Sequence, residues 1–153
     1  SGSGDCTSCT GSRALHNGQC LETCPPNYWE DNGNHTCESC HTTCYNCTNS
    51  ALNNCTECTG TRALHNSECV ENCPSVGFFE NSTTKTCDTC DGSCHTCDGP
   101  SAFECTGCID VGFYLNTGTN SCDACDSSCH KCSNSSSSDC TECTGSLGLH
   151  NNQ

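Results

Sequence analysis

The sequence predicts a small, disulfide-rich and mostly β protein: an elongated rod of tandem β-hairpin modules with no continuous hydrophobic core. Its 153 residues include 24 cysteines, which recur in the order Cys-x2-Cys-x10-Cys-x3-Cys-x12/13-Cys-x2-Cys-x3-Cys-x2-Cys-x7. Such self-similarity at a fixed period is typical of stacked modules. Hydrophobic residues make up only 31% of the chain, with one Trp and no Met. Cross-links are therefore expected to replace the missing core.

The residues between the cysteines repeat as well, and they divide the chain. CTSCTGSRALHNGQC at 6–20 returns as CTECTGTRALHNSEC at 55–69 and begins again as CTECTGSLGLHNNQ at 140–153. We expect a first repeat over 1–54, a second over 55–104, a shortened third over 105–139, and the start of a truncated fourth over 140–153. The chain is interpreted as a segment of a longer protein.

The third repeat has lost an even number of cysteines. Cys105 and Cys108 are followed by IDVGFYLNTGTNS and then Cys122, without the part that holds two further cysteines elsewhere. The parity indicates that Cys58, Cys69, Cys73 and Cys87 form a closed set of two disulfides. In the third repeat this set collapses to one bond, between Cys108 and Cys122.

Turn signals predict short hairpins, and no segment has a helical period longer than a turn or two. Asn17-Gly18 is a strong two-residue turn signal, which places Cys20 on the returning strand opposite Cys9. Three aromatic pairs share one repeat position: Tyr28-Trp29, Phe78-Phe79 and Phe113-Tyr114. We expect each pair to pack on the disulfides of its own module, the alternative being an exposed ladder for a ligand.

The charge excludes some partners. A net charge of -14, with only four Lys and Arg, repels nucleic acids and anionic lipids. No membrane-inserting segment is recognised. Calcium is an alternative use for the acidic residues, but they stand singly between cysteines and lack EF-hand spacing, so a solvated acidic face is preferred. The residues concerned are Asp88, Asp91, Asp98, Asp123 and Asp126.

Paired cysteines also allow two metal interpretations. Cys-x2-Cys pairs can supply thiolates to zinc, although the cysteine density and the x3 and x7 spacings favour disulfides. CESCH at 37–41 matches a haem attachment motif, but the same position reads CDTCD and CDACD in the next repeats. We therefore expect no metal and no cofactor apart from covalent N-glycans.

Five asparagines stand in N-glycosylation sequons. Asn34, Asn81 and Asn134 have ordinary middle residues, whereas Asn46 and Asn54 have a cysteine in the middle and are weaker acceptors if that sulfur is bridged. Chance is the alternative, since Asn, Ser and Thr are abundant. Sequons in turn-like segments of a disulfide-rich chain favour real N-glycans and a secreted protein, extracellular or at the cell surface. The serine run 135–138 is preferred as a plain flexible loop over an O-glycosylated one.

The string Cys37-x2-Cys40-x3-Cys44-x2-Cys47-x7-Cys55-x2-Cys58-x10-Cys69-x3-Cys73, followed by Pro and later an aromatic pair, resembles the furin-like cysteine-rich repeat of growth-factor-receptor ectodomains, R-spondins and protist surface proteins. The resemblance implies a rod of short β-hairpins. It also implies ten disulfides: Cys9–Cys20, Cys24–Cys37, Cys40–Cys47, Cys44–Cys55, Cys58–Cys69, Cys73–Cys87, Cys90–Cys97, Cys94–Cys105, Cys125–Cys132 and Cys129–Cys140. Cys6 and Cys143 are left over and are expected to pair outside the segment.

An enzyme is not expected, because the histidines follow no catalytic spacing and no carboxylate pair or nucleophile arrangement is present. His16, His65 and His150 share one position and are assigned to turns, while His35, His41, His95 and His130 fit no catalytic pattern.

Two functional classes stay open. The preferred one is structural: a glycosylated rod of an extracellular filament or cell-surface coat that assembles with copies of itself, similar in style to protist surface antigens. The alternative is a ligand-binding module of a receptor ectodomain or a secreted signalling protein. In R-spondins the loop matching Cys47 to Cys55 carries aromatic anchors. Here that loop offers only Leu52, and its sister only Phe103.

Overall fold

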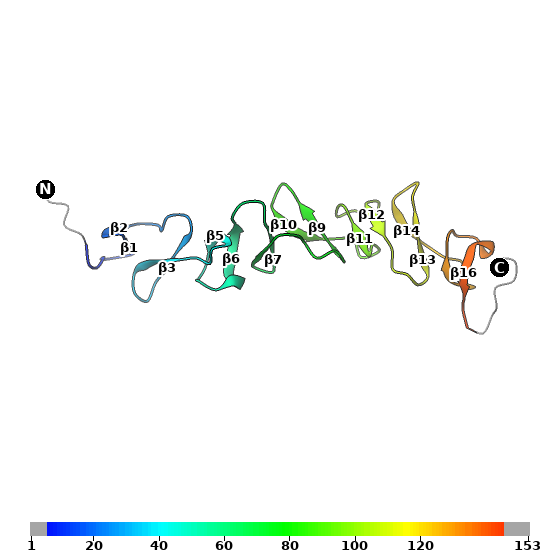
Figure 1. Ribbon diagram of the computed structural model, residues 1–153, viewed down its shortest axis with the longest axis horizontal. Coiled ribbons are helices and arrows are strands. Elements are labelled where there is room, and N and C mark those ends of the chain that lie inside the picture. The colour runs from blue at the N-terminus through cyan, green and yellow to red at the C-terminus, as the bar shows by residue number, and fades with distance from the viewer. Residues whose placement is uncertain (1–5, 146–153) are drawn as a thin grey trace. The chain divides into compact units, whose positions relative to one another are not determined.

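The computed structural model describes residues 6–145, and in this range it contains sixteen short β-strands, two 3-10 turns and no α-helix. The expected small, disulfide-rich and mostly β fold is therefore confirmed. The strands form separate hairpin sheets of two or four strands (Figure 1). Within the described residues two compact units are distinguished: 6–72 with 83–86, and 73–82 with 87–145.

The first unit begins with a four-stranded sheet in the order β2-β1-β4-β3. Its strands are β1 (Ala14–His16), β2 (Gln19–Leu21), β3 (Tyr28–Asp31) and β4 (Thr36–Ser39). Two antiparallel hairpins are joined by a single parallel contact, in which Leu15 of β1 pairs with Thr36 of β4. The Leu15 N–H donates to the His35 carbonyl at 2.7 Å.

The same unit continues with β5 (Cys44–Cys47), the 3-10 turn η1 (Leu52–Asn54) and β6 (Cys55–Cys58), followed by the hairpin β7 (Ala63–His65) and β8 (Glu68–Val70). β5 and β6 pair with two register irregularities, which place Cys47 opposite Cys55. Leu64 of β7 pairs in parallel with Thr86, and its N–H donates to the Lys85 carbonyl at 2.8 Å. The contact that Leu15 makes is thereby repeated.

The second unit holds β9 (Phe78–Asn81), most of β10 (Thr86–Thr89), and the pair β11 (Thr96–Cys97) and β12 (Cys105–Gly107). It continues with the hairpin β13 (Phe113–Asn116) and β14 (Ser121–Ala124), then β15 (Cys129–Cys132), the 3-10 turn η2 (Ser137–Asp139) and β16 (Cys140–Cys143). Each pair named here is antiparallel.

The hairpin turns are formed by residues that tolerate a left-handed backbone conformation. Asn17 and Gly18 both have positive φ, 48° and 75°, as a type I′ hairpin requires. Asn66 and Ser67 adopt the same conformation with φ of 48° and 65°. In the β1–β2 hairpin Cys20 lies opposite Leu15. The expectation that Cys20 lies opposite Cys9 was therefore wrong. Cys9 precedes the strand and reaches Cys20 only through the disulfide.

The core consists almost entirely of cystine. The buried hydrophobic residues among those described are all cysteines except Ala14 and Ala63, and no polar or charged residue is buried. In the first unit Cys40, Cys44, Cys55 and Cys69 form one cluster, and in the second Cys94, Cys97 and Cys105 form another. Sulfur thus occupies the space that aliphatic side chains fill in larger domains.

Candidate functional site

Eleven disulfides are present, and they join the same cysteines as the expected pairs, including Cys108 with Cys122 in the shortened repeat. Their Cα–Cα distances, 5.1 to 5.7 Å, are ordinary for cystine. The loops that they close have sequence separations of 7 to 14 residues. Cys6 and Cys143 stand outside these bonds, and their expected pairing beyond the segment stays a prediction.

Three buried sulfurs lie within 4.8 Å of one another, those of Cys44, Cys55 and Cys69. They belong to the disulfides Cys44–Cys55 and Cys58–Cys69, so they offer no thiolate to a metal. Cys37 and Cys40 of the CESCH string are likewise bonded, to Cys24 and Cys47. The short distances between these sulfurs therefore reflect two packed cystines.

The side chains of the aromatic pairs differ in their exposure to solvent. Trp29 packs against the first cystine cluster and Phe79 against the second, as expected for packing on disulfides. The first cluster includes Cys55 and Cys69, so Trp29 packs against a cluster that the first and second repeats share. Tyr28 and Phe113 are exposed instead.

The three ordinary sequons lie in different local environments. Asn34 is exposed in the turn between β3 and β4, and its amide donates to the Asp31 carboxylate at 2.7 Å. Asn134 is exposed, and among the described residues its amide nitrogen has no hydrogen-bond acceptor. Asn81 lies on β9 and is half-buried, and its amide donates to Asp88 at 2.7 Å. Glycan attachment at Asn34, Asn81 and Asn134 stays a prediction.

Asn81 has a counterpart that explains its side chain without a glycan. Asn116 holds the same place on β13 and donates to Asp123 at 2.8 Å, yet Asn116 is not in a sequon. The cross-strand pairing of amide with carboxylate is thus a repeated feature of these hairpins. Asn34 and Asn134 are therefore the better candidates for surface glycans.

The two sequons with a central cysteine are both constrained. Cys47 is bonded to Cys40, and Cys55 to Cys44, so the middle residue of each sequon is cross-linked. The Asn46 amide donates to Glu57 across the β5–β6 pair at 2.7 Å, and Asn54 donates to Asn53 at 3.1 Å. Because both middle cysteines are bridged, Asn46 and Asn54 are expected to be weaker acceptors than the three ordinary sequons.

Four of the five acidic residues expected on a solvated face accept hydrogen bonds on their carboxylates: Asp88, Asp91, Asp123 and Asp126. Ser93 donates its hydroxyl and N–H to Asp91 at 2.7 and 2.9 Å, and Ser128 donates to Asp126 at 2.6 and 3.0 Å. The hydroxyl bond, then the backbone bond, lowers the pKa of each aspartate. The Asn116 amide, then Ser121, lowers the pKa of Asp123. These carboxylates organise turns and hairpins.

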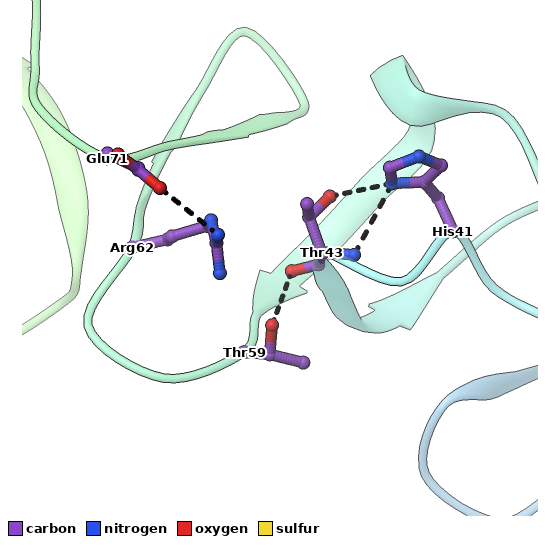
Figure 2. A network of polar contacts seen from close by, with 5 residues as sticks. All are labelled: His41, Thr43, Thr59, Arg62 and Glu71. Atoms are coloured by element: carbon purple, nitrogen blue, oxygen red, sulfur yellow. Dashed lines mark hydrogen bonds and ion pairs between the residues drawn. The ribbon is translucent and has the colours of Figure 1, made fainter.

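His41 holds the position of Asp91 and Asp126 in the first repeat, which the sequence reading missed. Its Nδ1 lies 2.8 Å from Thr43 Oγ1 and 3.4 Å from Thr43 N, where the other repeats have an Asp with a Ser (Figure 2). The signal was available as HTTC, DGSC and DSSC before the third cysteine of each group.

His16 and His65 lie at hairpin turns, as expected. The Asn17 and Asn66 amides contact their Nε2 atoms at 3.1 and 3.0 Å, and the His16 ring also meets the Tyr28 ring edge-on at 4.4 Å. His150 and its turn lie outside the described residues. No helix within 6–145 is long and apolar enough to cross a membrane.

No protein-family model matches the chain. No curated protein matches it either.

Proposed function

We propose that this chain is a non-enzymatic structural protein: a glycosylated, disulfide-stapled repeat rod of an extracellular filament or cell-surface coat. The furin-like resemblance belongs to the same proposal. The observation that carries it is the composition of the core, in which cysteines take ten of the twelve buried hydrophobic positions among the described residues. Modules of this kind can be added in number without a larger core, because each contacts mainly its neighbours.

An extracytoplasmic setting is supported by the bonds themselves. Disulfides at this density form and persist in oxidising compartments and are rare where thiols are kept reduced. The fold is compatible with an extracellular structural or binding module. Glycans on Asn34 and Asn134, together with closed cystines, would limit access by proteases. Self-assembly would then use exposed edges or aromatic side chains, since acidic chains repel one another at low salt.

The second candidate, a ligand-binding module, has one observation in its favour. Among residues 6–145, Phe103 is the most exposed large hydrophobic residue at 66%, and it lines a surface pocket of about 370 Å³. Its loop is held in place: the Phe103 N–H donates to Ser101 Oγ at 3.2 Å, and the Ser101 N–H donates to Glu104 at 2.9 Å. Exposed aromatic side chains on rigid loops are common anchors for protein partners.

Electron microscopy of the native particle separates the two functions. The structural proposal expects copies of this chain in repeated contact, each specific contact burying more than about 1,000 Å². Phe103→Ala and Leu52→Ala chains provide a matched pair, since both residues stand in sister loops. A monomer whose only large contact is a different folded protein, lost in Phe103→Ala but not in Leu52→Ala, would overturn the structural proposal and support the binding module.

A further inference from the structure

The turn before β5 uses a histidine as a hydrogen-bond acceptor where the other repeats use a carboxylate. In the turns before β11 and β15, one Oδ1 atom of Asp91 or Asp126 accepts from both the hydroxyl and the N–H of the serine two residues later. In the first repeat His41 Nδ1 faces the hydroxyl and N–H of Thr43 in the same way. With the ring proton on Nε2, Nδ1 accepts from both groups.

A proton on both ring nitrogens would change this arrangement in the first repeat. A protonated imidazole carries N–H on both nitrogens, so Nδ1 would become a donor facing the Thr43 N–H. The hydroxyl can turn to accept, but the backbone N–H cannot. Histidine is the side chain whose ordinary charge change falls between about pH 5 and 8.

The two aspartate turns serve as internal references in that range. Because the folded pKa values of Asp91 and Asp126 are lowered, their contribution is complete above the unfolded value of about 3.9 and is lost only as the pH falls through the lowered pKa. Both carboxylates therefore stay charged wherever an imidazole changes its protonation.

The His41 turn also holds the next part of the chain. The Thr43 carbonyl accepts from the Thr59 N–H and from Thr59 Oγ1, both at 3.0 Å, and so fixes the loop between β6 and β7 (Figure 2). The Ser128 carbonyl accepts from Thr144 in the same way at 3.1 and 3.2 Å. The His41 turn is thus hydrogen-bonded to a loop 16 residues further along the chain.

Charged neighbours do not hold the imidazole in either state. Among the described residues His41 makes no ion pair, and Arg62 is engaged with Glu71 at 3.3 Å. The titratable and charged side chains on the elements around the turn are Glu30 and Asp31 on β3, Glu38 on β4, Tyr45 on β5, Glu57 on β6 and Arg62 before β7.

We propose that the hydrogen bonds linking His41, Thr43 and Thr59 form a pH-sensitive contact in the first unit. These bonds are made near neutral pH and weaken in mildly acidic solution. The disulfides Cys40–Cys47 and Cys44–Cys55 flank the turn, so the opening is local and the fold around it is kept. This contact would make the first repeat sensitive to mild acid, whereas the other repeats would not be.

The test compares amide hydrogen exchange, corrected for intrinsic rates, in the natively bonded chain at about pH 7.5 and about pH 5. The Thr43 and Thr59 amides are expected to lose roughly three- to tenfold protection on acidification, as for one lost hydrogen bond. The amides of Ser93, Ser128 and Thr144 should keep theirs. A uniform response of all five amides would overturn the proposal.

Two variants test whether the imidazole itself causes the response, whichever turn it occupies. His41→Asp installs the acceptor of the sister turns and should abolish the pH response at Thr43 and Thr59. Asp126→His should create that response at Ser128 and Thr144. If His41→Asp still responds as the wild type does, or if Asp126→His folds and shows no response, the imidazole is not the cause and the proposal fails.

Discussion

Leu115 lies opposite Cys122 in the β13–β14 hairpin, as Leu15 lies opposite Cys20 and Leu64 opposite Cys69 in the first unit. The same hairpin places Phe113 opposite Ala124, as Tyr28 lies opposite Ser39 in β3–β4. One hairpin in the shortened repeat thus combines features of two. A backbone hydrogen bond at the turn supports this equivalence. The Asn120 carbonyl accepts from the Cys105 N–H at 2.9 Å, as the Ser67 carbonyl accepts from the Cys55 N–H.

The Cys108–Cys122 bond should contribute about as much stability as either one of the two disulfides that it replaces. It closes a sequence separation of 14 residues, for which the chain-entropy model gives about 3 kcal/mol. We expect the double variant Cys108→Ser/Cys122→Ser to lose roughly that much stability in the second unit, measured by hydrogen exchange of the β13–β14 amides. The β1–β2 amides in the other unit serve as the control. An unchanged β13–β14 hairpin would show that the bond contributes little.

Alkylation of the unreduced chain should leave the 22 cysteines of the eleven disulfides unlabelled. Peptide mass spectrometry without reduction should recover the Cys24–Cys37 and Cys73–Cys87 links, which are absent from the shortened repeat. Full labelling without reductant, or loss of fold on addition of a chelator, would instead indicate metal-bound thiolates.

Trp29 should tolerate Phe but not Ala. Its ring packs on the first cystine cluster, and among the described residues its buried indole N–H has no hydrogen-bond acceptor. Phe79 fills the equivalent place in the second repeat. Trp29→Phe removes an unsatisfied donor and should change the free energy of unfolding by less than about 1 kcal/mol, whereas Trp29→Ala should cost about 3 to 5 kcal/mol. Denaturant titration of the oxidised chain measures both, and equal losses would contradict this view of the site.

The carboxylates of Asp91 and Asp126 should titrate at low pH, because each accepts a hydrogen bond from the serine two residues later. Carboxyl carbon chemical shifts should show Asp91 and Asp126 losing their charge below the ordinary range. Ser93→Ala removes the hydroxyl that contributes most to lowering the pKa of Asp91, so that pKa should rise while Asp126 is unchanged. Ser128→Ala is the matched control with the opposite pattern. An Asp91 midpoint that does not move would assign the shift to something other than the turn.

N-glycans are expected on Asn34, Asn81 and Asn134, with the two exposed positions most fully occupied. Glycopeptide mass spectrometry of the protein from its native source measures each sequon separately. Asn34→Gln and Asn134→Gln should each remove one glycan and leave the fold intact. Asn81→Gln should in addition weaken the β9–β10 hairpin, because its amide donates to Asp88. Bare asparagines at all three positions would remove the glycoprotein part of the proposed function.

The sequence by itself determined the modules, the cystine core and the turn positions. Cysteine spacing repeats without ambiguity, and cross-links must supply what 31% hydrophobic residues cannot. Asn17-Gly18 specifies its turn because both residues tolerate positive φ. These features are local, or follow from one repeating pattern.

Only the tertiary structure decided which partners the remaining polar groups have. It placed Cys20 opposite Leu15 rather than Cys9, since strand register depends on pairing and a disulfide can connect residues outside it. It showed that the Asn81 amide is hydrogen-bonded to Asp88, and that His41 Nδ1 lies 2.8 Å from the Thr43 hydroxyl. Such roles depend on which donor lies about 3 Å away in the folded chain, and residue type alone does not reveal that distance.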